Sequence, residues 1–321
     1  MTVNETAEPR PSLKARFDDV QRRHPVLGFP WAVQRKYSED AGGRYAALMT
    51  YYGFLSLFPI LLLIVAIVSR VLAGNDQLRQ EVIAAIVPDQ AQATVDAALQ
   101  SMPSSGLPLL LGVLGVLGSA IGIITTAFDT LNHVAAVPHR LLLRGVRRYL
   151  RIFALLALLM LAAAAIGGLS VFLGTREPRA LTGVANAVAV VGILFLLMWS
   201  ASALLLPRAP RLREVWLMAL LGAVISTAFL AFGAILIPRF VEKSGAVYGA
   251  FATIVGLLAF IAIICRVLVY TAEVAVVHAW HLWPRSVDKE NPTEADRIAL
   301  GLLASEQERI DSQRVTSTIT N

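Results

Sequence analysis

The sequence predicts an all-α, polytopic membrane protein with six transmembrane helices, plus short amphipathic helices outside the membrane and at both cytoplasmic termini. Of its 321 residues, 56% are apolar and only 16% are charged, which is more apolar material than one soluble core needs. The charged residues cluster in short segments, and the long stretches between them are free of Asp, Glu, Lys and Arg. We therefore expect hydrocarbon to surround those stretches.

Six apolar segments are long enough to cross a bilayer. At about 1.5 Å per residue, roughly 20 apolar residues span a hydrocarbon layer about 30 Å thick. Buried helices of a large soluble protein rarely contain uncharged runs of this length. The predicted spans are about 45–72, 107–131, 149–173, 180–206, 214–238 and 246–280. They form a transmembrane domain over residues 45–281, between an N-terminal segment of residues 1–44 and a tail of residues 282–321.

Basic residues are distributed unevenly among the segments that join the spans. The two termini and the loops on their side of the membrane contain 21 of the 28 Lys and Arg residues, and the opposite loops contain six. Short loops rich in Lys and Arg stay in the cytoplasm, so both termini are predicted to be cytoplasmic in a bacterial-type inner membrane. The same distribution accounts for the net charge of +6 without nucleic acid as a partner, and anionic lipid headgroups are the expected partners.

The N-terminal segment is basic and carries an amphipathic pattern. We expect an interfacial helix that starts near Ser12 and is broken by Pro25, Gly28 and Pro30. A short apolar run followed by a cleavage site of small residues is missing from the first 44 residues, so we expect no removable signal peptide.

Two connecting segments are also expected to be partly helical. Residues 74–106 predict a pair of short amphipathic helices around Pro88, which either cap an outward-facing cavity or cover the rim of the bundle. In the tail, Asn291, Pro292 and Glu294 indicate the start of one amphipathic helix. Beyond Arg314 the periodicity ends, and a disordered end is predicted.

The sequence contains no recognisable catalytic or cofactor motif. Cys265 is the only cysteine, which excludes an internal disulfide and a thiolate metal cage. His278 and His281 are one turn apart, but no HExxH motif or carboxylate ligand set accompanies them. Walker, GxGxxG and Ser-centred nucleophile motifs are also missing. We therefore expect a protein that is not an enzyme and that uses no metal or cofactor.

The first span concentrates polar groups and a helix breaker near its middle, in the run TYYGFLSLFP from Thr50 to Pro59. Pro59 frees the carbonyl of Leu55, and a freed backbone group in lipid must meet a neighbouring helix, a hydroxyl or water. The kink is therefore either a packing feature or a face of a wet cavity.

Ionisable residues close to the cytoplasmic ends of the second and last spans are the other candidates. Charges within an apolar run are costly to insert, so they usually face a partner or an aqueous path. Arg266 either lines a cavity, pairs with Asp129 between helices, or extends its side chain to the interface. The candidate cavity or substrate path comprises Tyr51, Tyr52, Ser56, Pro59, Asp129, Arg266, Tyr270 and Glu273.

Small residues at regular spacing in the second span predict close helix packing. They are Gly112, Gly115, Gly118, Ser119 and Gly122, and smaller sets occur at Gly167 and Gly168, at Gly222, and at Gly245, Gly249 and Gly256. Such residues let helix backbones approach closely, and we interpret them as structural rather than as gating elements.

Several of these segments resemble a known family. They are AALMTYYGFLSLFP (Ala46–Pro59), TLNHV (Thr130–Val134), LPRAPRLREV (Leu206–Val215) and the Tyr248-Gly249-Ala250 opening of the last span. Together they resemble the YihY/BrkB family of inner-membrane proteins, its YhjD branch in particular, over roughly residues 30–282. The resemblance implies a six-helix inner-membrane protein, and members are sometimes discussed as transporters of lipids or other amphiphiles. Members have also carried a ribonuclease BN label, but this chain lacks the histidine and carboxylate ligands that metal-dependent RNA hydrolysis requires.

The leading functional hypothesis is a cofactor-free transporter or flippase-like protein for a lipid, an amphiphile or an anionic solute. Because no nucleotide motif is present, an ion gradient or the gradient of the substrate would have to supply the energy. The alternative is a non-transporting membrane scaffold or partner-binding protein, in which the polar groups only hold helices together. The expected partners are membrane lipids and an unknown amphiphilic or anionic substrate, without nucleic acid, and the sequence leaves room for a homo-oligomer.

Overall fold

The fold is helical throughout the part of the chain that the structure, a computed structural model, describes: residues 18–21, 23, 25–71, 107–174, 179–205, 212–243, 246–287 and 291–318. α-Helices make up 84% of these residues, and no strand occurs among them. In lipid each helix satisfies its own backbone hydrogen bonds, which explains why long apolar sequences fold in this way. The predicted external segment 74–106 lies outside the described residues.

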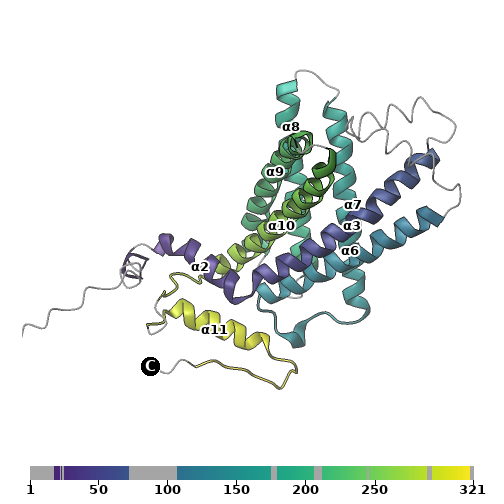
Figure 1. Ribbon diagram of the computed structural model, residues 1–321. Coiled ribbons are helices and arrows are strands. Elements are labelled where there is room, and N and C mark those ends of the chain that lie inside the picture. The colour runs from purple at the N-terminus through teal and green to yellow at the C-terminus, as the bar shows by residue number, and fades with distance from the viewer. Residues whose placement is uncertain are drawn as a thin grey trace, which may run out of the picture.

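Six long helices coincide with the six predicted spans (Figure 1). They are α3 (Gly42–Val71), α6 (Leu107–Val134), α7 (Val146–Gly174), α8 (Arg179–Leu205), α9 (Leu212–Lys243) and α10 (Ala246–Ala279). Three shorter helices accompany them: α2 (Pro25–Glu39), the 3₁₀ turn η1 (His139–Leu141) and α11 (Glu294–Glu306).

Four stretches of the described chain are long and apolar enough to cross a membrane. They are Leu110–Val134, Val146–Leu169, Thr182–Leu204 and Ile254–Ala279, and α9 adds the shorter apolar stretch Ala219–Gly233. At most 22% of the most apolar part of any of the four is buried inside the protein, so their side chains mainly face outwards. Apolar surface on this scale requires lipid, which fits a multi-pass membrane protein.

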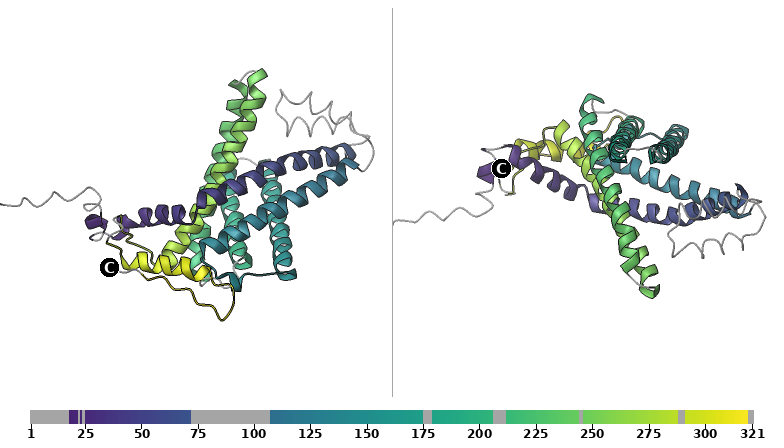
Figure 2. Two further views of the ribbon diagram at one scale, coloured as in Figure 1. Left: turned by 60° about the horizontal axis from the view of Figure 1, so that its bottom comes forward. Right: turned by 90° about the horizontal axis from the view of Figure 1, so that it is seen from above.

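The long helices pack as neighbouring pairs. α3 packs along α6 and also contacts α10, while α9 packs against both α8 and α10, and α7 packs against α8. The α3–α6 pair diverges from the α9–α10 pair with increasing distance from the C-terminus (Figure 2). α2, α11 and the C-terminal residues gather at one end of the bundle, which we call the tail side (Figure 1).

Glycines allow the close contact between α3 and α6. A Cβ atom on Gly115 would lie 2.8 Å from Pro59, and one on Gly122 would lie 2.5 Å from the ring of Tyr52. The prediction of close packing in the second span is thus confirmed at these two positions. It is wrong for Gly118, and also for Gly167, Gly168 and Gly256 in other spans, because a Cβ atom there would meet no heavy atom within 4 Å.

A small core joins α2, the end of α10 and α11. It contains Ala32 and Val33 of α2, Val277 of α10, Leu282 and Ala299, all buried. The expected breaks at Gly28 and Pro30 are wrong, because α2 begins at Pro25 and continues through both residues. Most of the helix expected from Ser12 to Pro25 lies outside the described residues. Proline fits the first position of a helix, where its missing N–H has no partner to lose.

The predicted tail helix is confirmed as α11. Thr293 caps it, since the Thr293 hydroxyl accepts a hydrogen bond from the Asp296 N–H and the Asp296 carboxylate accepts one from the Thr293 N–H. After α11 the chain continues to residue 318 with turns but without regular secondary structure, and the Arg140 N–H donates to the Glu308 carbonyl at 2.9 Å. The predicted disordered end stays a prediction.

The Gly122 contact predicts a defined loss of stability. Gly122→Ala forces the Tyr52 ring to move, and overpacking of this kind costs about 1–3 kcal/mol of unfolding free energy. Thermal unfolding in detergent measures the loss. Gly118→Ala on the same helix is the matched control and is expected to leave the melting temperature unchanged or raised. Equal melting temperatures for the two variants would contradict the packing role of Gly122.

Candidate functional site

A cavity of about 620 Å³ lies among α6, α7, α8, α9 and α10, in the tail-side half of the bundle. Its wall runs along α10 from Ile264 to Trp280, the residue that follows the helix, which corresponds to a length of about 24 Å at 1.5 Å per residue. α3 contributes Met49 to the wall. A cavity of this volume is in the range that holds a drug-sized ligand.

The described wall of this cavity is apolar and uncharged. It contains no Lys, Arg, Asp or Glu. Four of its side chains carry a hydroxyl group. The hydroxyls of Thr130, Ser202 and Thr271 each donate to a carbonyl of their own helix, at 2.7, 2.9 and 2.8 Å. The fourth, Ser226, is buried and has no hydrogen-bond partner among the described residues. Within the described wall, Ser226 is thus the hydroxyl without a hydrogen bond to its own helix, and its oxygen is enclosed by protein atoms.

The predicted site residues of α3 pack elsewhere. Tyr51 is 58% exposed on the outside of the bundle, whereas Tyr52 packs on α6. The Ser56 hydroxyl donates to the Gly53 carbonyl at 2.6 Å. Pro59 packs against α6 within a continuous helix. These four residues do not line the cavity described above, so their role in a substrate path stays a prediction.

Asp129 and Arg266 do not form the predicted pair. Arg148 of α7 donates to the Asp129 carboxylate at 3.0 Å, because the short connection between α6 and α7 brings the two together. Arg266 is exposed and forms no ion pair within the described part of the chain. Tyr270 stacks on Tyr37 of α2 with ring centroids 4.0 Å apart, and neither Arg266 nor Tyr270 lines the cavity.

Glu273, the last predicted site residue, is completely buried beside the tail-side end of the cavity. Its carboxylate lies 3.1 Å from the ammonium group of Lys36 on α2, and Lys36 also binds Asp40. The same ammonium group donates to the carbonyl of Val134, a residue of the cavity wall, at 2.9 Å. One lysine thus connects α2, α6 and α10 at this point.

His133 extends this network to the tail. Its Nδ1 lies 2.6 Å from the Glu306 carboxylate, and its Nε2 lies 3.1 Å from the carbonyl of Asp40. Burial raises the pKa of Asp40, although the nearby Lys36 acts in the opposite direction. We call Lys36, Asp40, His133, Glu273 and Glu306 the buried ion network.

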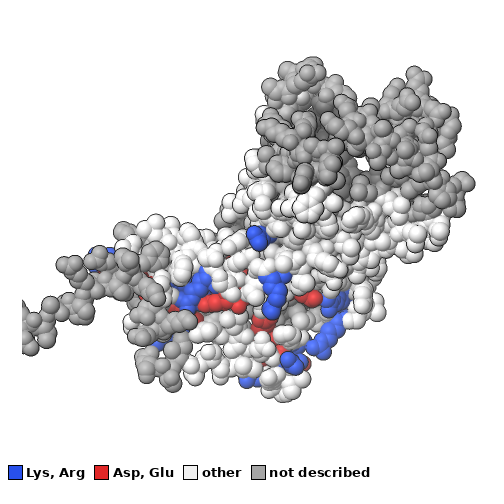
Figure 3. All heavy atoms as spheres, in the orientation of Figure 1, with Lys and Arg blue, Asp and Glu red and all other residues white. Residues whose placement is uncertain are grey.

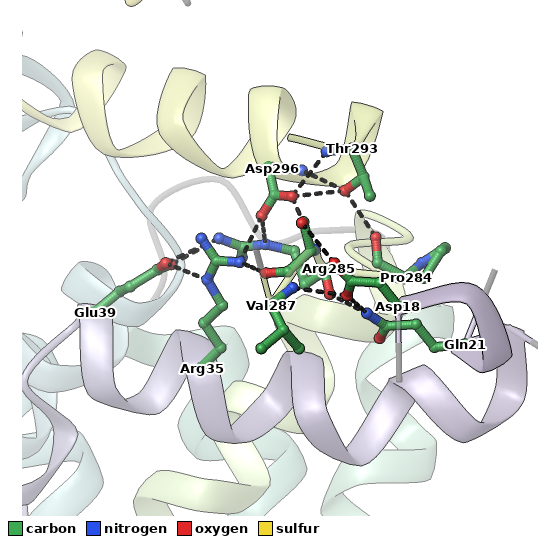
Figure 4. Close-up of polar contacts among 10 residues, drawn as sticks. Asp18, Gln21, Arg35, Glu39, Pro284, Arg285, Val287, Thr293 and Asp296 are labelled. Atoms are coloured by element: carbon green, nitrogen blue, oxygen red, sulfur yellow. Dashed lines mark hydrogen bonds and ion pairs between the residues drawn. The ribbon is translucent and has the colours of Figure 1, made fainter. Parts of the chain in front are cut away.

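A second cluster fastens the tail to α2 (Figure 4). Arg285, with only 1% of its side chain exposed, donates to Asp296 at 2.6 Å and to both carboxylate oxygens of Glu39 at 2.9 and 3.0 Å. Arg35 lies 2.9 Å from Glu39 and 3.1 Å from Asp296. Two arginines and two carboxylates therefore balance their charges, and we call these four residues the arginine cluster.

Asp296 combines this pairing with its capping role. Burial alone would raise its pKa, but hydrogen bonds from Arg285, from the N–H groups of Thr293 and Ser286, and from the Thr293 hydroxyl lower it. Asp18 binds the same loop, accepting hydrogen bonds from the Val287 N–H at 2.8 Å and the Ser286 hydroxyl at 3.1 Å. The N-terminal and C-terminal segments are thus held together by charge-assisted hydrogen bonds.

Charged side chains gather at the tail side of the molecular surface, and the described surface away from the tail is white in this view (Figure 3).

Sequence reasoning predicted this separation of charged and apolar segments but missed the residues that form the ion pairs. Lys36 and Asp40 have the i, i+4 spacing of a helical ion pair, which is a readable signal. The partners Glu273 and Glu306 are far apart in sequence, and no local pattern points to them.

The comparisons with known proteins agree with this architecture. The family model described as "Virulence factor BrkB" matches residues 33–296. The "Inner membrane protein YhjD" of Escherichia coli (strain K12) is 26% identical over 102 residues, which cover 32% of this chain and 30% of that protein. The match therefore spans less than a third of that relative's length. No solved structure matches the chain.

The arginine cluster predicts how the tail detaches. Arg285→Gln leaves the buried Asp296 and the nearby Glu39 without their guanidinium partner, and breaking a buried pair in this way costs about 3 kcal/mol or more. We expect faster hydrogen–deuterium exchange in α11 and earlier proteolysis of the tail. Arg297→Gln is the control. Arg297 is exposed, and its ion pair with Glu294 is long, at 3.9 Å, so its loss should have little effect. Unchanged exchange in the Arg285 variant would contradict the docking role.

Proposed function

The chain belongs to the virulence factor BrkB family, and from this membership we propose that it is an inner-membrane protein that binds a lipid-like amphiphile and moves it within the bilayer. The observation that carries the proposal is the long apolar cavity in the tail-side half of the helical bundle. The proposed protein has no catalytic step and no cofactor.

The chemistry of the cavity favours hydrocarbon over an ionic solute. Its described wall has no charged side chain, and a charged group placed there would lose its hydration without compensation. The wall on α10 is about 24 Å long, whereas one leaflet supplies about 15 Å of hydrocarbon, so an acyl chain fits along it. A charged headgroup would stay at the rim.

A scaffold without transport activity is the rival proposal. It is favoured by the arginine cluster and the buried ion network, which hold helices and tail together and do not line the cavity. The two proposals differ in one measurable respect: only a transporter moves lipid at a rate that depends on the space inside the cavity.

We further propose six spans with both termini in the cytoplasm. The uneven distribution of Lys and Arg supports this orientation, as does the gathering of charges around α2 and α11 on one side of the bundle (Figure 3). On this basis the residues of the tail and those of the segment around Gln90 lie on opposite sides of the membrane.

Cysteine labelling tests the orientation. Cys265→Ser removes the only cysteine, and single cysteines are then placed at Gln90 or at Gln313 in the tail. In intact cells a membrane-impermeant maleimide is expected to label the cysteine at position 90 and to reach position 313 only after the cells are opened. Labelling of position 313 in intact cells would contradict the proposed orientation.

Lipid movement in proteoliposomes tests the function. The purified protein is reconstituted with fluorescent phospholipids, and the movement of the probe between leaflets is followed by chemical quenching from outside. The wild-type protein is expected to move the probe faster than empty vesicles do. A rate equal to that of empty vesicles, across several headgroups and chain lengths, would contradict transport and favour the scaffold.

A cavity-filling variant tests the route. Ala201→Phe adds a ring to the cavity wall and is expected to slow lipid movement about tenfold, because the acyl chain loses its space. Ala203→Phe, at an exposed position on the same helix, is the matched control and is expected to keep the wild-type rate. Melting temperatures show that both variants are folded. Equal rates for the two variants would exclude this cavity as the route.

A further inference from the structure

His133 lies where three parts of the protein meet: the end of α6, the turn between α2 and α3, and the end of α11. Each nitrogen of its ring faces an oxygen atom. When Glu306 is ionised, both oxygen atoms are hydrogen-bond acceptors and neither can donate. The carboxylate of Glu306 is 2.6 Å from Nδ1, and the carbonyl of Asp40 is 3.1 Å from Nε2. The position thus presents two acceptors to one imidazole.

A neutral imidazole cannot satisfy this arrangement. It has one N–H, so one ring nitrogen would present its lone pair to another lone pair. The imidazolium form has two N–H groups and donates to both acceptors. With Glu306 ionised, the hydrogen-bond geometry therefore requires a proton on His133.

The charged groups around His133 also favour its protonated form. Glu273 of α10 and Glu306 of α11 are buried carboxylates, and Asp40 of the α2–α3 turn is a third. Lys36 of α2 is the one other cation of the network, and Tyr45 of α3 contacts the His133 ring with centroids 5.1 Å apart. A protonated His133 adds a second cation beside these buried acidic groups.

We propose that His133 is a proton-binding site that latches α11 to the membrane domain. With the proton bound, His133 donates to Glu306 and Asp40 and so holds the last turn of α11 against α6. When the proton leaves, one of the two hydrogen bonds is lost, and the buried carboxylate of Glu306 loses its positively charged partner. This latch is inferred from the hydrogen bonds and charged groups around His133, and it does not require that the protein transports lipid.

The direction of the pH effect follows from the proton balance. Docking of α11 takes up a proton at His133, so a low pH favours the docked state and a rising pH weakens it. The docking energy from this proton is present while histidine is charged and is lost as the pH passes through the range in which histidine titrates. Val134, next to His133, lines the cavity, so the latch lies at the tail-side end of that cavity.

Hydrogen–deuterium exchange of the full-length protein in lipid nanodiscs tests the latch. Exchange of the α11 amides is measured from pH 6 to pH 9 and corrected for the intrinsic dependence of exchange on pH. For the wild-type protein we expect the open fraction of α11 to rise about tenfold over this range, in line with the loss of one charge-assisted hydrogen bond. A corrected exchange rate that is constant with pH would overturn the proposal.

Two variants keep the test decisive. His133→Gln is expected to open α11 at every pH and to remove the pH dependence, while Glu306→Gln is expected to remove the pH dependence by eliminating the buried charge. Wild-type protection of the α3 and α6 amides shows that each variant is folded. A pH dependence that persists in Glu306→Gln would overturn the latch even if His133→Gln fails to fold.

Two other histidines serve as controls. His139 lies 2.5 Å from the Glu306 carbonyl through Nδ1, and a neutral imidazole can donate that single hydrogen bond. His139→Gln is therefore expected to weaken docking by a constant factor while the pH dependence stays. His278 is exposed and stacks on Trp283, so His278→Gln should change neither the docking of α11 nor its pH dependence. Loss of the pH dependence in His139→Gln would assign the proton to His139 and overturn the proposal for His133.

Discussion

Hydrocarbon cannot form hydrogen bonds, and the structure of this protein depends on that constraint. Each long helix satisfies its own backbone hydrogen bonds. Several hydroxyl side chains also donate to carbonyls of the preceding turn, as those of Thr50, Ser119 and Thr126 do. Once polar groups are satisfied within each helix, the fit between helices is left to side-chain shape. Gly115 and Gly122 provide that fit where α6 receives Pro59 and the ring of Tyr52.

The same constraint determines where charge is found. Charged groups that are removed from water need partners, and at the tail side they obtain them from segments that are distant in sequence. Arg285 reaches back to Glu39, and Lys36 reaches Glu273. The apolar cavity and the charged clusters are therefore separate in space, with ligand-sized volume on one side of Val134 and ion pairs on the other.

The sequence predicts the parts of the fold that local patterns determine. The long helices follow from runs of apolar residues, and α11 follows from its capping residues, because both depend on residues a few positions apart. The partners of Glu273 and Asp129 depend on how helices pack, so the sequence identified these residues as unusual but not their partners. Pro30 was misread for a related reason: the helix-breaking tendency of proline is local, while the core formed by Ala32, Val277 and Leu282 stabilises α2 across it. No local pattern points to Ser226, since only the packed bundle shows that its hydroxyl is buried without a partner among the residues that the structure describes.

The arginine cluster joins the beginning of the chain to its end, which has a consequence for biosynthesis. A ribosome completes α2 early, whereas Arg285 and Asp296 emerge after all the long helices. During most of translation Glu39 and Lys36 therefore lack their final partners and must be accommodated by lipid headgroups or water. The cluster closes only when the whole membrane domain has been synthesised, so its closure marks the completion of insertion.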